Sequence, residues 1–232
     1  RCTGSVNIAT TVASGFSPAR TGNTFEVAGN AALRTLTMSG TGNTFGALYV
    51  YNDVAGSRTV RLLSDVSARV VRVGHGASAL GNTELDPFGS TLQASEAGSP
   101  LAAGVGLQVV GNGAAARGTL MFGSGGGTVD ILSGDLALGQ DGVLSMSGGT
   151  LKLAGNWTET SNASFLPSGG TVSFNGTVGQ TISSLVANRF YHLKVEGGAR
   201  IVSPANSLLV LGDLIVDDGT FTTNTFSHEV RG

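Results

Sequence analysis

The sequence predicts an all-β protein, a right-handed parallel β-helix (β-solenoid) with about 20–22 residues per coil. Three observations predict this fold class. Phrases recur at multiples of one step, short apolar runs alternate with polar residues, and 37 glycines stand with Ser, Asn and Asp between those runs. Such residues form turns, where the backbone often needs positive φ.

The recurring phrases set the length of the step. "TGNTF" occurs at Thr21–Phe25 and again at Thr41–Phe45, twenty positions later. "GGT" occurs at Gly126–Thr128, Gly148–Thr150 and Gly169–Thr171, so its copies follow one another at nearly the same step. A fixed step of this size is typical of repeat architectures.

A longer phrase supports the same step, because "GDLALGQDGVL" at Gly134–Leu144 is echoed by "GDLIVDDGTF" at Gly212–Phe221, close to four steps further along the chain. Short alternating pairs of apolar residues occur along the second half of the chain: Val129/Ile131, Leu136/Leu138, Leu144/Met146, Leu151/Leu153, Val172/Phe174, Leu193/Val195 and Leu214/Val216. Alternation places these side chains on one face of a strand.

A parallel solenoid explains both the step and the alternation, because one coil cannot bury its apolar face without neighbours. At this step the chain makes roughly eleven coils. If the two copies of "TGNTF" occupy the same place in successive coils, Phe25 stacks on Phe45 inside the tube. Asn23 then lies over Asn43 at a turn, where stacked amides form a hydrogen-bonded ladder.

An antiparallel β-sandwich is the alternative fold, and it explains the alternation but not the shared step. We expect residues 1–232 to form one solenoid domain. The chain starts at Arg1 and shows no signal peptide, so it is expected to be a piece of a longer protein. No apolar run reaches the length of a membrane helix, and Cys2 is the single cysteine, so no internal disulfide is expected.

The segment Gly148–Ala199 resembles stretches of large secreted bacterial surface proteins, the β-helical rods of autotransporter passengers and filamentous adhesins. The resemblance rests on G-x-W, F-x-P, G-T-V-x-F-N-G, G-Q-x-I and F-Y-x-L. The matching positions are Gly155, Trp157, Phe165, Pro167, Phe174, Asn175, Gly176 and Gln180. The resemblance implies an extracellular scaffold, gives these positions structural roles and carries no catalytic residue across.

No catalytic or cofactor site is expected from the sequence. "GHG" around His75 resembles one element of polygalacturonases, but the acidic residues and Arg-x-Lys of that family are absent or in the wrong order. His192 and His228 stand alone, so no metal site is expected. The net charge of −2 gives no electrostatic reason to expect nucleic acid as a partner.

Two surface patterns have a functional and a simpler interpretation. The arginines at positions 58, 61, 69 and 72 fit a basic stripe for an anionic glycan, but the favoured interpretation is a solvated outer face. "TFTTNTF" at Thr220–Phe226 is rich in threonine, yet a threonine array of the ice-binding kind needs the same spacing on several coils. The sequence suggests it on one coil only.

The sequence therefore predicts a non-enzymatic, extracellular structural or adhesive module of a bacterial surface protein. Neither end shows a capping helix, so the chain is expected either to continue into further coils of a longer protein or to join a second copy end to end into a filament. A surface glycan is the other expected partner. The alternative function is that of a polysaccharide-binding or polysaccharide-cleaving β-helix.

Overall fold

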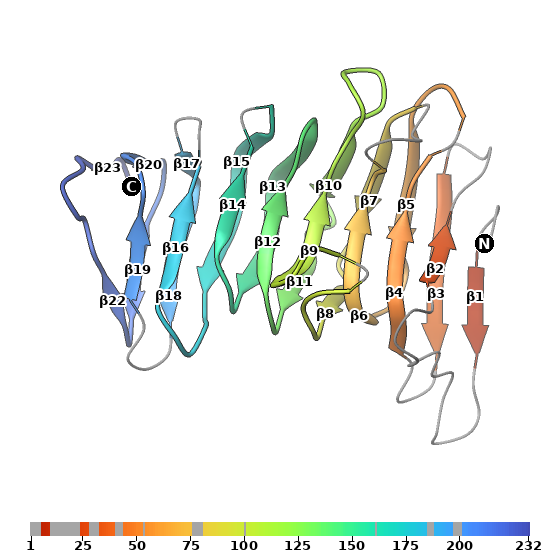
Figure 1. The fold of residues 1–232 in the computed structure, drawn as a ribbon, viewed down its shortest axis with the longest axis horizontal. Coiled ribbons are helices and arrows are strands. Elements are labelled where there is room, and N and C mark those ends of the chain that lie inside the picture. The colour runs from red at the N-terminus through yellow and green to blue at the C-terminus, as the bar shows by residue number, and fades with distance from the viewer. Residues whose placement is uncertain are drawn as a thin grey trace.

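The computed structural model describes residues 6–9, 24–27, 33–39, 44–52, 54–75, 81–99, 101–160, 162–184, 188–196 and 201–232. Every regular secondary-structure element among the described residues is a β-strand, and the paired strands run parallel. They wind into a parallel β-solenoid of about 8 turns, which confirms the predicted fold class. Figure 1 shows the strands stacked in chain order along a rod, from β1 at one end to β22 and β23 at the other.

Each coil crosses three faces, which we name A, B and C in chain order. Face A contains β1 (Val6–Ala9), β3 (Leu33–Ser39), β5 (Arg58–Leu62), β7 (Thr83–Asp86), β10 (Gly118–Phe122), β17 (Asn188–Phe190), β20 (Leu208–Val210) and β23 (Glu229–Val230). Face B contains β8 (Thr91–Ala94), β11 (Thr128–Ile131), β18 (His192–Glu196) and β21 (Leu214–Asp217). Face C contains β2 (Thr24–Val27), β9 (Val105–Val109), β12 (Asp135–Leu138), β14 (Trp157–Glu159), β16 (Gln180–Ser183), β19 (Ile201–Pro204) and β22 (Thr220–Phe221).

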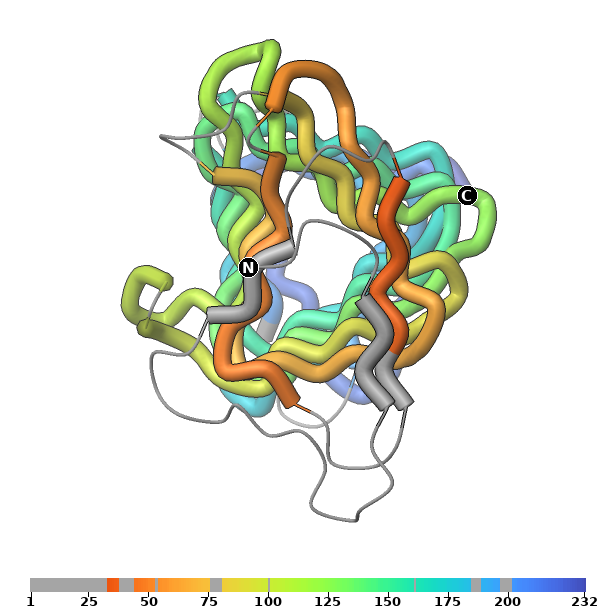
Figure 2. Tube along the Cα trace, turned by 90° about the vertical axis from the view of Figure 1, so that its right-hand side faces the viewer, coloured from red at the N-terminus to blue at the C-terminus, as the bar shows by residue number. Residues whose placement is uncertain are grey.

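Four longer strands bend around an edge of the rod and serve two faces each. Faces B and C share β4 (Thr44–Val50) and β6 (Val66–Val73), which pair with each other on both faces. Faces A and B share β13 (Gly142–Leu153) and β15 (Ser164–Phe174). Figure 2, a view turned to look along the rod, shows successive coils enclosing a common centre.

Inward side chains fill that centre in columns that run along the rod. On face B one column follows the strand register through six coils and is at most 2 % exposed: Val66, Leu92, Val129, Leu151, Val172 and Leu193. Where three coils meet, the rings of Trp157, Phe165 and Phe190 pack with centroids 4.9, 5.4 and 5.3 Å apart. Alternation along each strand thus becomes one continuous core.

The coils are longer than expected in the central part of the rod. Leu144 pairs with Phe165, one predicted step further along the chain. Leu92 pairs with Val129, which lies more than one and a half steps away. The extra residues include the segment between β8 and β9, where Leu101 packs on the outer sides of Ala47 and Val70. The chain therefore makes about 8 turns and not roughly eleven.

The register also differs from two alignments that the repeated phrases predicted. Phe25 pairs with Leu48, so it is not aligned with Phe45, because this coil is longer than the step between the two phrases. Phe45 is fully buried on face B and pairs with Ala68. Asn23 and Asn43 lie outside the described residues.

The two "GDL" phrases likewise occupy different places, since the first begins β12 on face C and the second begins β21 on face B. Trp157 and Phe174 are fully buried in columns, between Leu136 and Ile182 and between Leu153 and Val195.

Candidate functional site

The outer side of face B carries a column of four threonines on four successive coils. Thr91, Thr128, Thr150 and Thr171 are aligned by the strand register, are half-buried, and are followed in the same column by His192. The sequence had suggested a threonine array on one coil only. The regularly spaced "GGT" repeats were the signal for this column, because their register places three of the threonines on one line.

A charged column runs beside the threonines and holds Asp130, Lys152, Ser173 and Lys194. The Lys194 ammonium lies 2.7 Å from a carboxylate oxygen of Glu196, and that carboxylate also accepts a hydrogen bond from the Ser173 hydroxyl. The hydrogen bond from Lys194 lowers the pKa of Glu196 below its ordinary value, whereas burial raises the pKa of Asp130. Opposite charges on this face therefore offset one another.

On the edge between faces B and C, three successive turns enclose a groove of about 440 Å³. The turns join β11 to β12, β13 to β14 and β15 to β16. The lining residues are Leu132, Ser133, Gly134, Asp135, Ala154, Gly155, Asn156, Asn175, Gly176, Thr177, Val178 and Gly179. Asn175, expected to be a structural stacking residue, lies in this groove, and its buried side-chain oxygen has no hydrogen-bond partner.

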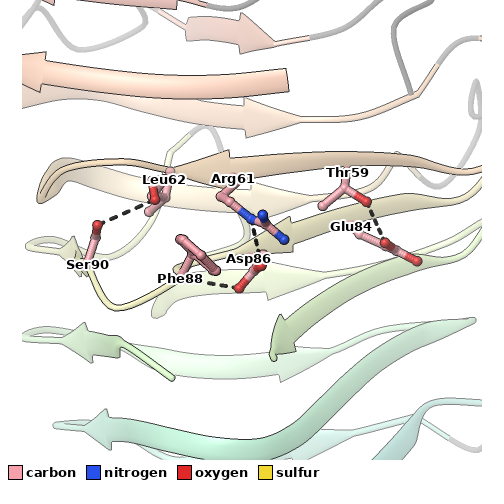
Figure 3. Close-up of polar contacts among 7 residues, drawn as sticks. All are labelled: Thr59, Arg61, Leu62, Glu84, Asp86, Phe88 and Ser90. Carbon is pink, nitrogen blue, oxygen red and sulfur yellow. Dashed lines mark hydrogen bonds and ion pairs between the residues drawn. The ribbon is translucent and has the colours of Figure 1, made fainter. Parts of the chain in front are cut away.

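The outer side of face A carries a polar network between β5 and β7, which Figure 3 shows. The Thr59 hydroxyl donates to Glu84 over 2.6 Å, and Arg61 Nε lies 3.2 Å from an Asp86 oxygen. The Asp86 carboxylate is only 2 % exposed and also accepts the backbone N–H of Phe88. The Arg61 guanidinium covers the Phe88 ring, 4.1 Å from its centroid.

This network changes how the four arginines near residue 60 are interpreted. Arg69 forms an ion pair with Glu96, and Arg72 lies over the Tyr49 ring on face C. The arginines at positions 58 and 61 belong to face A. They therefore form no single basic stripe.

Two ionisable side chains point into the core, and the sequence analysis identified neither. Arg34 is 1 % exposed, and its Nε and Nη2 atoms have no hydrogen-bond partner. Burial, with the positive charge of Arg58 as a second cause, lowers the pKa of Arg34. Glu159 accepts hydrogen bonds from the Trp157 indole over 2.8 Å and from the Ser184 hydroxyl, and burial raises its pKa. The alternation along their strands places both side chains inward. The sequence does not reveal this, because inward positions are recognised by apolar residues and these two are polar.

The predicted single histidines have local structural contacts in the folded chain. His192 Nδ1 accepts the Asp213 N–H at 3.0 Å, His228 Nδ1 accepts the Leu208 N–H at 3.1 Å, and the His75 ring packs near Tyr51. Within the described ranges, no three His, Cys, Asp or Glu side chains lie close enough to hold a metal ion. No helix in this part of the chain has the length and apolar character to cross a lipid bilayer.

In the last described coil, side chains that continue the inward columns are exposed. Val216 continues the inward column of Phe174 and Val195 and is 47 % exposed, and Val230 continues the column of Val210 and is 49 % exposed. The backbones of β21, β22 and β23 pair on one side only among the described strands. This coil is therefore an apolar surface whose alternating side chains repeat the spacing of the core.

Comparisons with known proteins add no relative. The scan against protein-family models, the search of curated proteins and the search of solved structures each found no match to this chain.

Proposed function

We propose that this protein is a non-enzymatic structural or adhesive rod, an extracellular module of a bacterial surface protein. The observation that carries the proposal is the stack of parallel coils, in which Val216 and Val230 continue columns that are buried in the coils before them. A further coil placed on this end would bury them.

The occupant we propose for this end is the first coil of a second copy. Strands with free N–H and C=O groups accept another parallel strand, and apolar side chains on alternate positions fit the columns of an identical rod. Head-to-tail contact of this kind does not close on itself and forms filaments. The resemblance of Gly148–Ala199 to secreted surface rods supports the extracellular and bacterial part of the proposal.

Negative-stain electron microscopy across a concentration series tests the end-to-end contact. The wild-type chain forms filaments one rod wide that lengthen with concentration. Val216→Lys introduces a charge into the uncovered column and leaves short single rods. Ile215→Lys is the matched control, because Ile215 is 41 % exposed on the same strand but points to the outer side of face B.

Filaments from the Val216→Lys variant would show that the rods associate through another surface. Wild-type rods that stay single at every concentration would reject the second copy as the occupant of this end.

A further inference from the structure

The groove on the edge between faces B and C exists because one turn is longer than its neighbours. Three residues connect β11 to β12 and three connect β13 to β14, but five, 175–179, connect β15 to β16. The longer turn extends beyond the other two and forms one wall, with Val178 67 % exposed. Leu132, 48 % exposed, stands on the opposite side.

The floor of the groove carries almost no side chain. Ala154 occupies the outward position that Leu132 holds in the coil before and Asn175 in the coil after. A Cβ atom on Gly155 would lie 2.2 Å from the Gly134 carbonyl oxygen, so the tight stacking of the backbone excludes any side chain there. The hollow is therefore a fixed feature of how these turns stack.

Two polar side chains with unused hydrogen-bonding capacity line the groove. Asp135 Oδ1 accepts the backbone and side-chain N–H groups of Asn156, and no described residue donates to its Oδ2. Asn156 in turn accepts from Thr181, so its oxygen is already engaged. The Asn175 side-chain oxygen has no partner, and rotation of this amide presents either a donor or an acceptor to a ligand.

The spacing of these two groups indicates the size of the ligand. Asp135 lies on the first of the three coils and Asn175 on the third, so their backbones are two strand spacings, roughly 9.5 Å, apart, although the Asp135 carboxylate reaches Asn156 on the second coil. One carboxylate and one amide are too few protein ligands for a dedicated metal site. A ligand that contacts both is elongated along the rod, and the carboxylate disfavours an anionic ligand.

We propose that this groove binds a neutral saccharide about two sugar rings long. Its hydroxyl groups donate to the free Asp135 oxygen and exchange hydrogen bonds with the Asn175 amide. The C–H faces of its rings pack against Leu132 and Val178. This site deepens the adhesive part of the proposed function, which it presupposes, and is independent of the end-to-end contact at Val216.

Titration calorimetry with cellobiose, maltose and N,N′-diacetylchitobiose as neutral probes, and digalacturonate as the acidic probe, tests the site. At least one neutral probe binds the wild-type chain more tightly than digalacturonate. Ala154→Leu fills the floor from the solvent side and weakens that binding about tenfold or more. Asp135→Asn keeps an acceptor for Asn156 but removes the charge, and weakens binding by a smaller factor.

Ala137→Leu is the matched control, since Ala137 is an outward alanine of β12 outside the groove, and it leaves binding unchanged. Failure of all three neutral probes to bind, or tighter binding of digalacturonate, would overturn the assigned ligand class. Equal binding by wild type and Ala154→Leu would place the saccharide elsewhere. Electron microscopy of Ala154→Leu tests the end-to-end contact separately. We expect this variant to form filaments as the wild-type chain does, because the groove lies away from the end of the rod.

Discussion

The central coils, from β5 to β12, and the C-terminal coils, from β13 onward, share the same apolar columns but differ in the lengths of their turns. Along the inward column of face B, the chain between neighbours is longest from Leu92 to Val129, whereas the steps from Val129 onward to Leu193 are shorter and nearly equal. The apolar column is unbroken through both regions. Core burial therefore fixes which strands stack, while the turns set how many residues a coil uses.

Glycine has two different roles in these coils. In the C-terminal coils a Cβ on Gly155, Gly169 or Gly176 would lie 2.1–2.4 Å from a carbonyl oxygen of the coil before. In the central excursions, Gly98 and Gly113 have positive φ, but no atom lies within 4 Å of an added Cβ. Glycine permits close stacking at the first three positions and sets only the backbone direction at the other two.

The largest expected effect comes from comparing one glycine of each kind. Gly155→Ala forces two turns of the C-terminal coils apart and lowers the free energy of unfolding by about 3 kcal/mol or more. Gly113→Ala meets open space and costs only the strain of positive φ, about 1–2 kcal/mol. Urea denaturation of both variants measures the two costs. Equal losses would mean that close stacking adds nothing to the cost of a side chain at Gly155.

A smaller effect is expected where the central coils are joined by polar side chains. Asp86→Ala leaves the Phe88 N–H and Arg61 without their acceptor at a nearly buried position, and lowers the free energy of unfolding by about 2 kcal/mol. Asp217→Ala is the control, because its contact with Lys194 lies in solvent at the C-terminal end, and thermal unfolding should not detect its loss. An Asp86→Ala variant as stable as the wild-type chain would show that the network in Figure 3 does not stabilise the central coils.

The smallest effect concerns the buried carboxyl of the C-terminal coils. Burial raises the pKa of Glu159 above its ordinary value of 4.5, so the folded chain keeps this proton at a pH where the unfolded chain has lost it. Stability therefore falls as pH rises from 4.5 through the raised pKa, and stays lower above it. Glu159→Gln keeps an acceptor for Trp157 and removes this fall. Identical pH profiles of unfolding for both proteins would exclude Glu159 as its source.

The sequence predicted the fold class and, at the three "GGT" repeats, the spacing of neighbouring coils. The geometry of the turns explains why it succeeded there. "GGT" marks an edge of the rod where glycines with positive φ are followed by an outward threonine, and such tight turns keep both spacing and letters constant. "TGNTF" failed as a guide, since one copy reaches face C at Phe25 and the other reaches face B at Phe45.

The groove could not be predicted from the sequence for a related reason. It depends on a difference of two residues between neighbouring turns, and that difference has meaning only after the register is known. Asn175 was assigned a structural role because it matches the G-T-V-x-F-N-G motif of the resemblance, and nothing in the sequence shows that its side-chain oxygen has no partner. The inward positions of Arg34 and Glu159 were missed because polar residues interrupt the apolar alternation that marks a column.

Formation of a designed disulfide tests the central claim, the parallel register across the longest coil. In a Cys2→Ser background, Thr91→Cys and Thr128→Cys lie on adjacent strands, although a whole coil of chain separates them in the sequence. Adjacent parallel strands bring two Cα atoms to about 4.8 Å, within the range that a disulfide spans. We predict that mild oxidation closes an intramolecular disulfide in this pair and not in the pair Thr91→Cys and Lys152→Cys, which lies on a further coil. No disulfide in the first pair, or an equal yield in both, would contradict the register on which the solenoid rests.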